Sequence, residues 1–251
     1  MVAAALVVGA VVKLWPEGTP HRRILAGAKR FEVLAPGATL PSGSECAARI
    51  RAAPEVVAAN AVQNRTTWHS AWDGEFSSRA DGQFTGTTDE IIQWAACKWG
   101  MDEDILRAQA YQESHWRMDA YGDANAVGVG EDGETTCAPG PGGAVRADGT
   151  CAESIGIMQV RTQYYRPAAE GAVASSAYNL DVSMSMWRKC FEGKMDYLHN
   201  VSADYHAGDA WGCIGRWFSG QWYNDPAKRY IELVHGHLDA RVWEQADFSS
   251  S

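Results

Sequence analysis

A glutamate lies on the apolar face of an expected helix. In the stretch "DILRAQAYQESHWRMD" (residues 104–119), Leu106, Ala110 and Glu113 are spaced i, i+4 and i+7. That spacing places the three side chains on one face of an α-helix, because about 3.6 residues make one turn. An apolar wall disfavours the charged form of a carboxyl group, so the group can hold and donate a proton near neutral pH. Pairing with an arginine would be the ordinary explanation for Glu113; the alternative is an acid that protonates the leaving oxygen of a glycosidic bond.

Two later stretches carry residue types that suit a saccharide site. In "SIGIMQV" (154–160), Gly156 and Gln159 flank an apolar pair. A glycine allows close approach of the backbone, and an amide can bind sugar hydroxyl or N-acetyl groups. The stretch "DYHAGDAWGCIGRWFSGQWYN" (204–224) is rich in aromatic rings, which stack on the apolar faces of sugars. Core packing alone would explain most of these rings, so they support a sugar site only together with Glu113.

The order of four motifs resembles a known family. The motifs "ESHW" (113–116), "SIGIMQV" (154–160), "DYHAG" (204–208) and "AKRYIELV" (227–234) follow one another as in the soluble lytic transglycosylases and the related goose-type lysozymes. The similarity covers roughly residues 87–240. It implies a mainly α fold of the α+β lysozyme-like class, with a loop-rich N-terminal extension that has no counterpart in the family.

The resemblance assigns roles to individual residues. Glu113 matches the family's catalytic acid, and Ser114 matches the serine beside it. Ser114 and the other matched positions are expected to bind substrate in the cleft: Gly156, Met158 and Gln159 of a Gly-Leu-Met-Gln motif, Tyr205 and His206 of a Tyr-Asn-Ala-Gly motif, and Tyr230 of the last helix. In this chain Ile157 replaces the leucine of the first motif, and His206 replaces the asparagine of the second.

The family's reaction cleaves the β-1,4 bond between N-acetylmuramic acid and N-acetylglucosamine in peptidoglycan. The resemblance implies that Glu113 acts first as acid and then as base, which leaves a 1,6-anhydro end. The expected partners are peptidoglycan glycan strands, with no cofactor and no metal. An inverting lysozyme would instead need a second carboxylate about 6.5–9.5 Å from the acid. The sequence offers five candidates for it: Asp119, Asp123, Glu131, Asp132 and Glu153.

Two further classes of function stay open. One is a module that binds the cell wall and has lost catalysis, although Glu113 is retained. The other is a secreted disulfide scaffold for protein partners, which would explain the cysteines but not Glu113 together with "GIMQV". A net charge of −9 on 251 residues argues against nucleic acid, which requires a basic surface. The length suits one main domain, and we expect a monomer.

The six cysteines show no spacing typical of a zinc site. An even number spread along the chain favours disulfides and an oxidising compartment, although reduced, buried cysteines of a cytosolic protein are the alternative. Pairing of neighbours predicts Cys46–Cys97, Cys137–Cys151 and Cys190–Cys213. Residues 2–12 form an apolar run that is too short to span a bilayer but long enough for the core of a signal peptide. A basic leader and a convincing cleavage site are missing, yet export to the cell envelope or beyond is favoured.

The elements that must position these residues are mostly helices. The sequence divides into an apolar segment (1–15), a loop-rich extension (16–86) and a main domain (87–245) with a glycine-rich insertion at 122–150. Thr87 and Glu90 form a capping-box pattern, and Gly100 predicts the end of that helix. We expect the insertion to be a long loop or an irregular subdomain. The extension can hold short helical or strand pieces, such as residues 44–52. The other helices are expected at about 102–117, 154–166, 181–192, 194–206 and 226–240, the last with Pro226 in its first turn.

Overall fold

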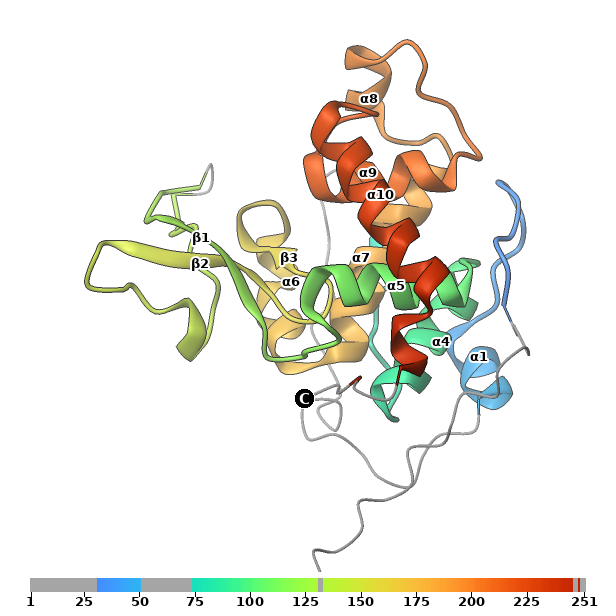
Figure 1. Ribbon diagram of the computed structural model, residues 1–251, viewed down its shortest axis with the longest axis horizontal. Coiled ribbons are helices and arrows are strands. Elements are labelled where there is room, and N and C mark those ends of the chain that lie inside the picture. Colours follow the sequence, from blue (N-terminus) through green and yellow to red (C-terminus); the bar gives the residue numbers. More distant parts are fainter. Residues whose placement is uncertain (1–30, 51–73, 131–132, 246–247, 249–251) are drawn as a thin grey trace, which may run out of the picture.

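The computed structural model describes residues 31–50, 74–130, 133–245 and 248, and it is mainly helical with one small sheet (Figure 1). The helices are α1 (Gly43–Arg49), α3 (Gly74–Ser77), α4 (Thr88–Trp99), α5 (Glu103–Ser114), α6 (Thr162–Ala174), α7 (Ser176–Phe191), α8 (Asp196–Val201), α9 (Ala210–Ser219) and α10 (Asp225–Ala240). The short 3-10 turn η1 (Pro141–Gly143) lies within the insertion, and η2 (Val242–Glu244) follows α10. The strands are β1 (Tyr121–Ala126), β2 (Thr150–Ile155) and β3 (Val160–Arg161). The expected mainly α class is confirmed, whereas the segment 1–15 and residues 16–30 and 51–73 of the extension lie outside the described residues.

Helix α4 begins and ends where the sequence predicts. The Thr87 side chain accepts a hydrogen bond from the Glu90 amide, and the Glu90 carboxylate accepts one from the Thr87 amide. Gly100 ends the helix with φ 63°, a left-handed conformation that glycine adopts without a steric penalty. Between these ends nearly every side chain of α4 is buried.

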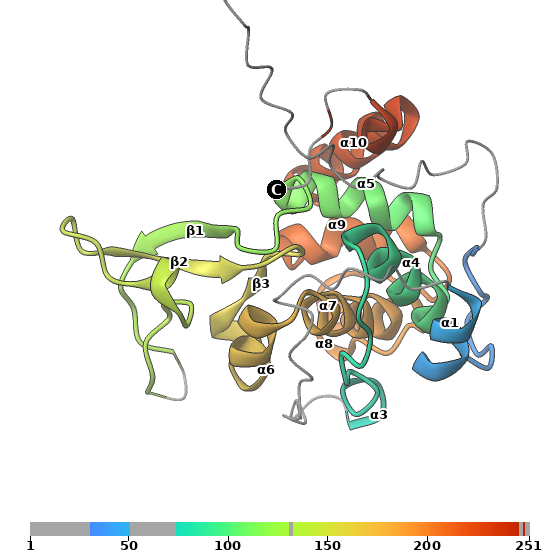
Figure 2. The ribbon, with the colours of Figure 1, turned by 90° about the horizontal axis from the view of Figure 1, so that it is seen from below.

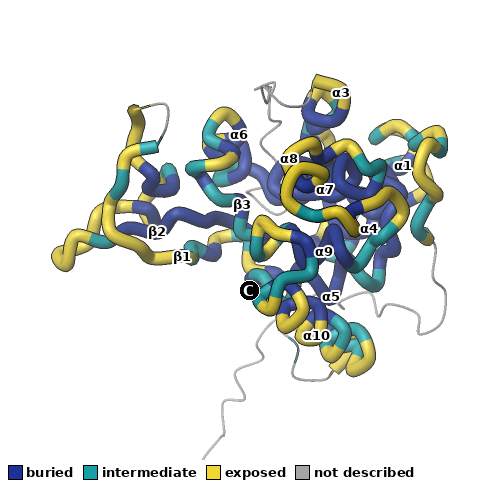
Figure 3. The backbone as a smooth tube through the Cα atoms, turned by 90° about the horizontal axis from the view of Figure 1, so that it is seen from above, coloured by how far each residue is buried: buried dark blue, intermediate teal, exposed yellow. Residues whose placement is uncertain are grey.

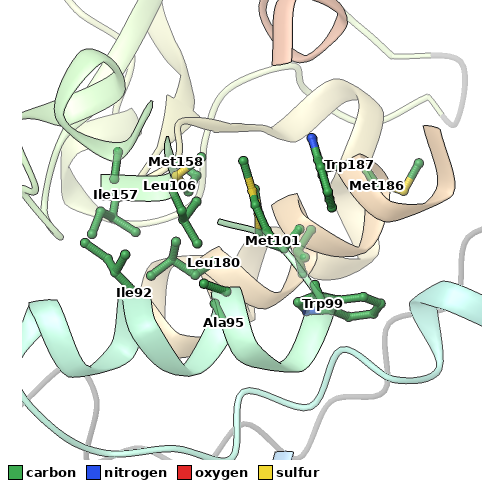
Figure 4. Packing of buried hydrophobic residues seen from close by; sticks show 14 of the residues in the cluster. Ile92, Ala95, Trp99, Met101, Leu106, Ile157, Met158, Leu180, Met186 and Trp187 are labelled. Atoms are coloured by element: carbon green, nitrogen blue, oxygen red, sulfur yellow. The ribbon is translucent and has the colours of Figure 1, made fainter. Parts of the chain in front are cut away.

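Helix α7 is the central helix, because all of its residues are buried. It packs against α3, α4, α6 and α9, while α10 covers α5 and α9 on the other side. In Figure 4 the side chains of Ile92 on α4, Leu180 on α7 and Leu106 on α5 lie close together in the hydrophobic core. Burial of this much apolar surface is the main term that stabilises such a fold.

The two ends of the glycine-rich insertion are strands, which the sequence did not predict. The described residues between them form an irregular connection with one short 3-10 turn, as expected of a long loop or an irregular subdomain. β1 and β2 pair antiparallel, with Tyr121 opposite Ile155, and the hairpin projects from the helical body (Figures 1 and 2). β3 adds a short third strand beside β2. Side chains of β2 are buried and those of β1 are largely exposed (Figure 3). The sequence did not predict β1, because its residues show no alternation of apolar and polar side chains.

Two helices differ from the sequence prediction. A helix over 154–166 is wrong, because Ser154 and Ile155 complete β2 and α6 begins only at Thr162. Helix α9 was not predicted, since Gly212 and Gly215 lower its helix propensity. Both glycines allow close packing: a Cβ on Gly212 would lie 2.3 Å from the Trp222 ring. The predicted helices at 102–117, 181–192, 194–206 and 226–240 are present as α5, α7, α8 and α10 with shifted ends.

The described part of the N-terminal extension packs onto the main domain. The Arg188 guanidinium, fully buried on α7, donates to the carbonyl oxygens of Leu34 (2.8 Å) and Ala35 (2.7 Å). Its Nε donates to the Glu192 carboxylate at 2.8 Å, and that carboxylate also accepts the Gly37 amide. Residues 34–37 are therefore held by a buried ion pair.

Three disulfides have the pairing that neighbour spacing predicts. Cys46–Cys97 joins α1 to α4, Cys137–Cys151 joins the insertion to β2, and Cys190–Cys213 joins α7 to α9. Structural disulfides are typical of proteins that mature outside a reducing cytosol. In the described part of the chain, no helix combines the length and apolar character that crossing a bilayer requires.

Candidate active site

Glu113 occupies the last turn of α5, and the end of that helix is tightly fixed. His115 and Trp116 both adopt a left-handed backbone, with φ of 54° and 61°, which stops the helix directly after Ser114. The buried Trp116 indole then donates to the Arg107 carbonyl at 2.9 Å, which closes the chain back on α5. The direction in which Glu113 points is thus set by the backbone that follows it.

Two aromatic side chains hold the Glu113 carboxyl group. The Tyr230 hydroxyl, from α10, donates a short hydrogen bond to Oε1 of Glu113. The Trp217 side chain, from α9, lies close enough to the carboxyl group to lower its pKa. The Trp217 indole nitrogen lies 3.2 Å from the Met158 carbonyl oxygen, which fixes the ring. Glu113 as a residue is half-buried, and its carboxyl group has a defined orientation at the junction of α5, α9 and α10.

The surroundings of Glu113 favour its protonated form. The pKa of Glu113 is raised from 4.5 to about 8, chiefly by burial and to a smaller degree by the negative charge of Asp123, while Tyr230 and Trp217 act in the opposite direction. Desolvation penalises the charged carboxylate, and among the described residues no cation offsets this penalty. At neutral pH Glu113 therefore carries a proton that it can donate.

Tyr230 also decides which oxygen of Glu113 carries that proton. Burial, and then the neighbouring Glu113, raise the pKa of the Tyr230 phenol well above its usual value, so the phenol remains a hydrogen-bond donor. A donor on Oε1 makes that oxygen an acceptor and leaves the acid proton to Oε2. The site thus has one defined acidic oxygen.

Ser114 connects Glu113 to the turn at 156–159. Its hydroxyl donates to the Ile157 carbonyl at 2.9 Å, and the Gly156 amide donates to the Ala120 carbonyl at 2.8 Å. Gly156 has φ 77°, and a Cβ there would lie 2.2 Å from the Asn179 amide nitrogen. Asn179 in turn accepts the Met158 amide at 2.9 Å. Ser114 and Gly156 therefore shape the backbone beside the acid.

Met158 and Gln159 have structural roles in this turn. The Met158 side chain is fully buried in the hydrophobic core, so the expectation that it lines a cleft is corrected. The Gln159 side chain is half-buried, and its Nε2 donates to the carbonyls of Gly156 (2.8 Å) and Ala120 (3.3 Å). Gln159 thus holds the turn and the start of β1 next to Glu113.

Tyr205 and His206 do not join Glu113 in the way that the motif implies. Tyr205 is buried, and its hydroxyl donates to the Cys190 carbonyl at 2.8 Å and accepts the Met195 amide. Its ring contacts Trp222. His206 is exposed, with Nδ1 2.8 Å from the Asp204 carbonyl oxygen. The structure gives Tyr205 a packing role and shows no contact between either residue and Glu113 in the described residues.

The candidates for a second carboxylate differ in their exposure, in their ion pairs and in their influence on Glu113. Asp119 is exposed beside Arg117, and Glu153 is buried in an ion pair with Arg161 at 2.6 Å. Asp123, on β1, is close enough to Glu113 for its charge to raise the pKa of that group. Its carboxylate accepts a short hydrogen bond from the Ser154 hydroxyl. Asp123 is the candidate best placed to act with Glu113, and positions 131 and 132 lie outside the described residues.

Sequence reasoning missed two residues of the site. Trp217 lies within the aromatic-rich stretch, but nothing in its spacing separated it from core tryptophans. Asn179 was missed because a buried amide in a helix gives no pattern at the level of residue types. Among the described side chains, no group of three or more His, Cys, Asp or Glu residues is arranged to hold a metal ion.

Comparison with protein-family models, with curated proteins and with solved structures finds no match for this chain. The class that fold and site define together is a mainly α protein with three disulfides and a half-buried, protonated glutamate held by a tyrosine and a tryptophan. Any particular function must be argued from these residues.

The raised pKa of Glu113 predicts a pH-dependent stability difference. A carboxyl with a folded pKa above its unfolded value stabilises the fold fully below the unfolded pKa of 4.5, and that contribution is lost as pH rises through about 8. The variant Glu113→Gln lacks the carboxyl group that titrates. The unfolding free energy of the variant, minus that of the wild type, should therefore rise by about 4 kcal/mol between pH 5 and pH 9.

Urea unfolding of both proteins at five or six pH values measures this difference. Glu232→Gln, at an exposed position on α10, is the matched control and should show a nearly constant difference. A constant difference for Glu113→Gln as well would contradict the raised pKa.

Proposed function

We propose that this protein is a peptidoglycan lytic transglycosylase that cleaves the β-1,4 bond between N-acetylmuramic acid and N-acetylglucosamine. The observation that carries the proposal is Glu113. It is a single, oriented carboxyl group whose pKa is raised to about 8, so it holds its proton at neutral pH. The motif order that places Glu113, Ser114 and Tyr230 in this family supports the same reaction. Tyr230 contacts Glu113 directly, and Ser114 binds the turn at Ile157.

In the first step Oε2 of Glu113 gives its proton to the glycosidic oxygen, and the bond from C1 to that oxygen breaks. The carbonyl oxygen of the substrate's own N-acetyl group bonds to C1, and the resulting oxazolinium ring carries the positive charge. No second carboxylate is needed for this step. Glu113 is now charged, and the hydrogen bond from Tyr230 stabilises the carboxylate, with Trp217 acting in the same direction.

In the second step the Glu113 carboxylate removes the proton from the C6 hydroxyl of the muramic acid. The C6 oxygen attacks C1, the bond between C1 and the acetamido oxygen breaks, and a 1,6-anhydro ring closes. Glu113 regains the proton that it lost, and no water is consumed. A carboxyl with a pKa near neutrality suits this double role, since it gives and takes a proton at similar cost.

The protein would act as a monomer outside the cytosol, on glycan strands of the cell wall. Three disulfides support such a compartment. The net charge of −9 fits a protein that does not bind nucleic acid.

A second candidate function is hydrolysis, and Asp123 favours it. An inverting glycosidase needs a carboxylate that activates a water on the opposite side of the sugar. Asp123 is exposed on β1, it influences the charge of Glu113, and Ser154 fixes its orientation. The product would then carry a reducing end.

Product analysis separates the two reactions. Purified peptidoglycan is digested, and the fragments are identified by mass spectrometry. We expect anhydro-ended fragments, one water lighter than hydrolysed ones, and Asp123→Asn should keep producing them. Reducing ends that fall by about 100-fold or more in Asp123→Asn would establish hydrolysis instead.

The Asp123→Asn variant has a matched control and an internal check. Asp119→Asn removes an exposed carboxylate and should leave the products and the rate unchanged. Because the charge of Asp123 raises the pKa of Glu113, Asp123→Asn should move the alkaline limb of the activity profile to lower pH. Absence of cleavage by the wild type would remove both enzymatic proposals.

A further inference from the structure

An exposed aromatic ring lies directly against the residue that holds the acid. Phe218, in the last turn of α9, is 57% exposed. Its ring stacks on that of Tyr230, with centroids 4.8 Å apart and planes 3° from parallel. Tyr230 is buried and donates to Oε1 of Glu113. Phe218 is thus linked to Glu113 through Tyr230, by one ring stack and one hydrogen bond.

Exposure of a single phenylalanine is common on protein surfaces and carries no argument by itself. The orientation of Phe218 is what distinguishes it. Its inner face is covered by Tyr230, so its outer face is the one that faces solvent. The ring cannot turn freely without losing this stack.

The backbone under Phe218 is also fixed. Gly220 ends α9 with φ 71°, and its carbonyl accepts a hydrogen bond from the Tyr197 hydroxyl at 3.0 Å. The neighbouring Trp217 is held at the Met158 carbonyl. A rigid aromatic face next to an acid is pre-organised for a flat, weakly polar ligand, because little conformational entropy is lost on binding.

We propose that Phe218 is a stacking platform for a pyranose ring of the substrate, next to the bond that Glu113 cleaves. A β-1,4-linked sugar presents axial C–H groups on its ring faces and keeps its hydroxyl and N-acetyl groups at the edge. Such a face packs against an aromatic ring, while polar edges reach solvent or protein donors. This inference rests on the proposed function for its ligand class and adds a subsite that the motif comparison did not assign.

The test measures binding and catalysis separately. Binding of a soluble β-1,4-linked N-acetylglucosamine oligomer is measured by calorimetry in the Glu113→Gln background, where cleavage cannot interfere. Phe218→Ala should weaken binding about tenfold. In the active background the same change should raise KM by a similar factor, leave kcat within about twofold and leave the pH profile in place.

Two further variants separate stacking from packing. Phe218→Trp keeps a flat face and should bind the oligomer at least as well as the wild type. Phe218→Leu keeps apolar volume without a flat face and should behave like Phe218→Ala. Val201→Ala, an exposed apolar position on α8, controls for loss of surface area and should change nothing.

The outcomes distinguish this inference from the proposed function. Wild-type affinity for the oligomer in Phe218→Ala or in Phe218→Leu would contradict the stacking role of Phe218, while the role of Glu113 as the acid would be unaffected. A shifted pH profile in Phe218→Ala would show that the ring acts through Tyr230 as a structural support, and would also contradict the stacking role. Weaker oligomer binding by Phe218→Ala in a protein that cleaves no peptidoglycan would keep the platform and remove the enzymatic proposal.

Discussion

Glu113→Gln is expected to lower the rate of peptidoglycan cleavage by about 10²–10⁴-fold. The amide has nearly the size of the carboxyl group, and its oxygen can still accept the hydrogen bond from Tyr230. It has no proton to give to the glycosidic oxygen and cannot take one from the C6 hydroxyl. Both halves of the proposed cycle fail together, which is why this is the largest effect on activity.

The rate is measured as release of soluble fragments, at a pH below 8 where wild-type Glu113 is protonated. Glu232→Gln makes the same chemical change at an exposed position on α10 and should retain full activity. Thermal unfolding of the variant excludes misfolding as the cause of a loss. More than a tenth of wild-type activity in Glu113→Gln would mean that another group supplies the proton.

Arg188→Met is expected to lower the free energy of unfolding by about 3–5 kcal/mol. The guanidinium is fully buried and donates to the carbonyls of Leu34 and Ala35 as well as to the Glu192 carboxylate. Methionine fills similar volume without a donor. Glu192 would be left without its cation, and two carbonyl oxygens would lose their donors in a buried place.

Urea unfolding under oxidising conditions, with the three disulfides intact, measures this change. Arg229→Met, at an exposed position on α10, removes the same charge and should alter the free energy by less than about 0.5 kcal/mol. A loss below about 1 kcal/mol for Arg188→Met would show that water replaces the guanidinium and that residues 34–37 are only loosely held.

The sequence predicted correctly those helix ends that depend on residues within one turn of the chain. The capping box at Thr87 and Glu90, the stop at Gly100 and the start at Pro226 act through backbone groups within one turn. Neighbouring cysteines paired as expected because each disulfide joins elements that are close in both sequence and space. The contact between Glu113 and Tyr230 was implied only as shared membership of a cleft, and it is a direct hydrogen bond.

Other parts depended on tertiary contacts that residue types do not encode. The β1–β2 hairpin has one largely exposed strand, so no alternation marked it. Met158 and Tyr205 lie inside the protein although their motifs suggested a cleft, because an apolar or aromatic residue near a site is equally suited to the core beneath it. Trp217 reaches Glu113 only because α9 packs between α7 and α10, and α9 itself was not visible in the sequence.

The disulfide between α1 and α4 has a consequence for shortening the chain. The motif resemblance starts near residue 87, which invites expression of a fragment that begins there. Such a fragment would lack Cys46 and leave Cys97 as an unpaired thiol. It would also deprive Arg188 of the carbonyls of Leu34 and Ala35. The fragment would be prone to intermolecular cross-linking and disulfide exchange, whereas one that starts before residue 34 keeps every cysteine matched.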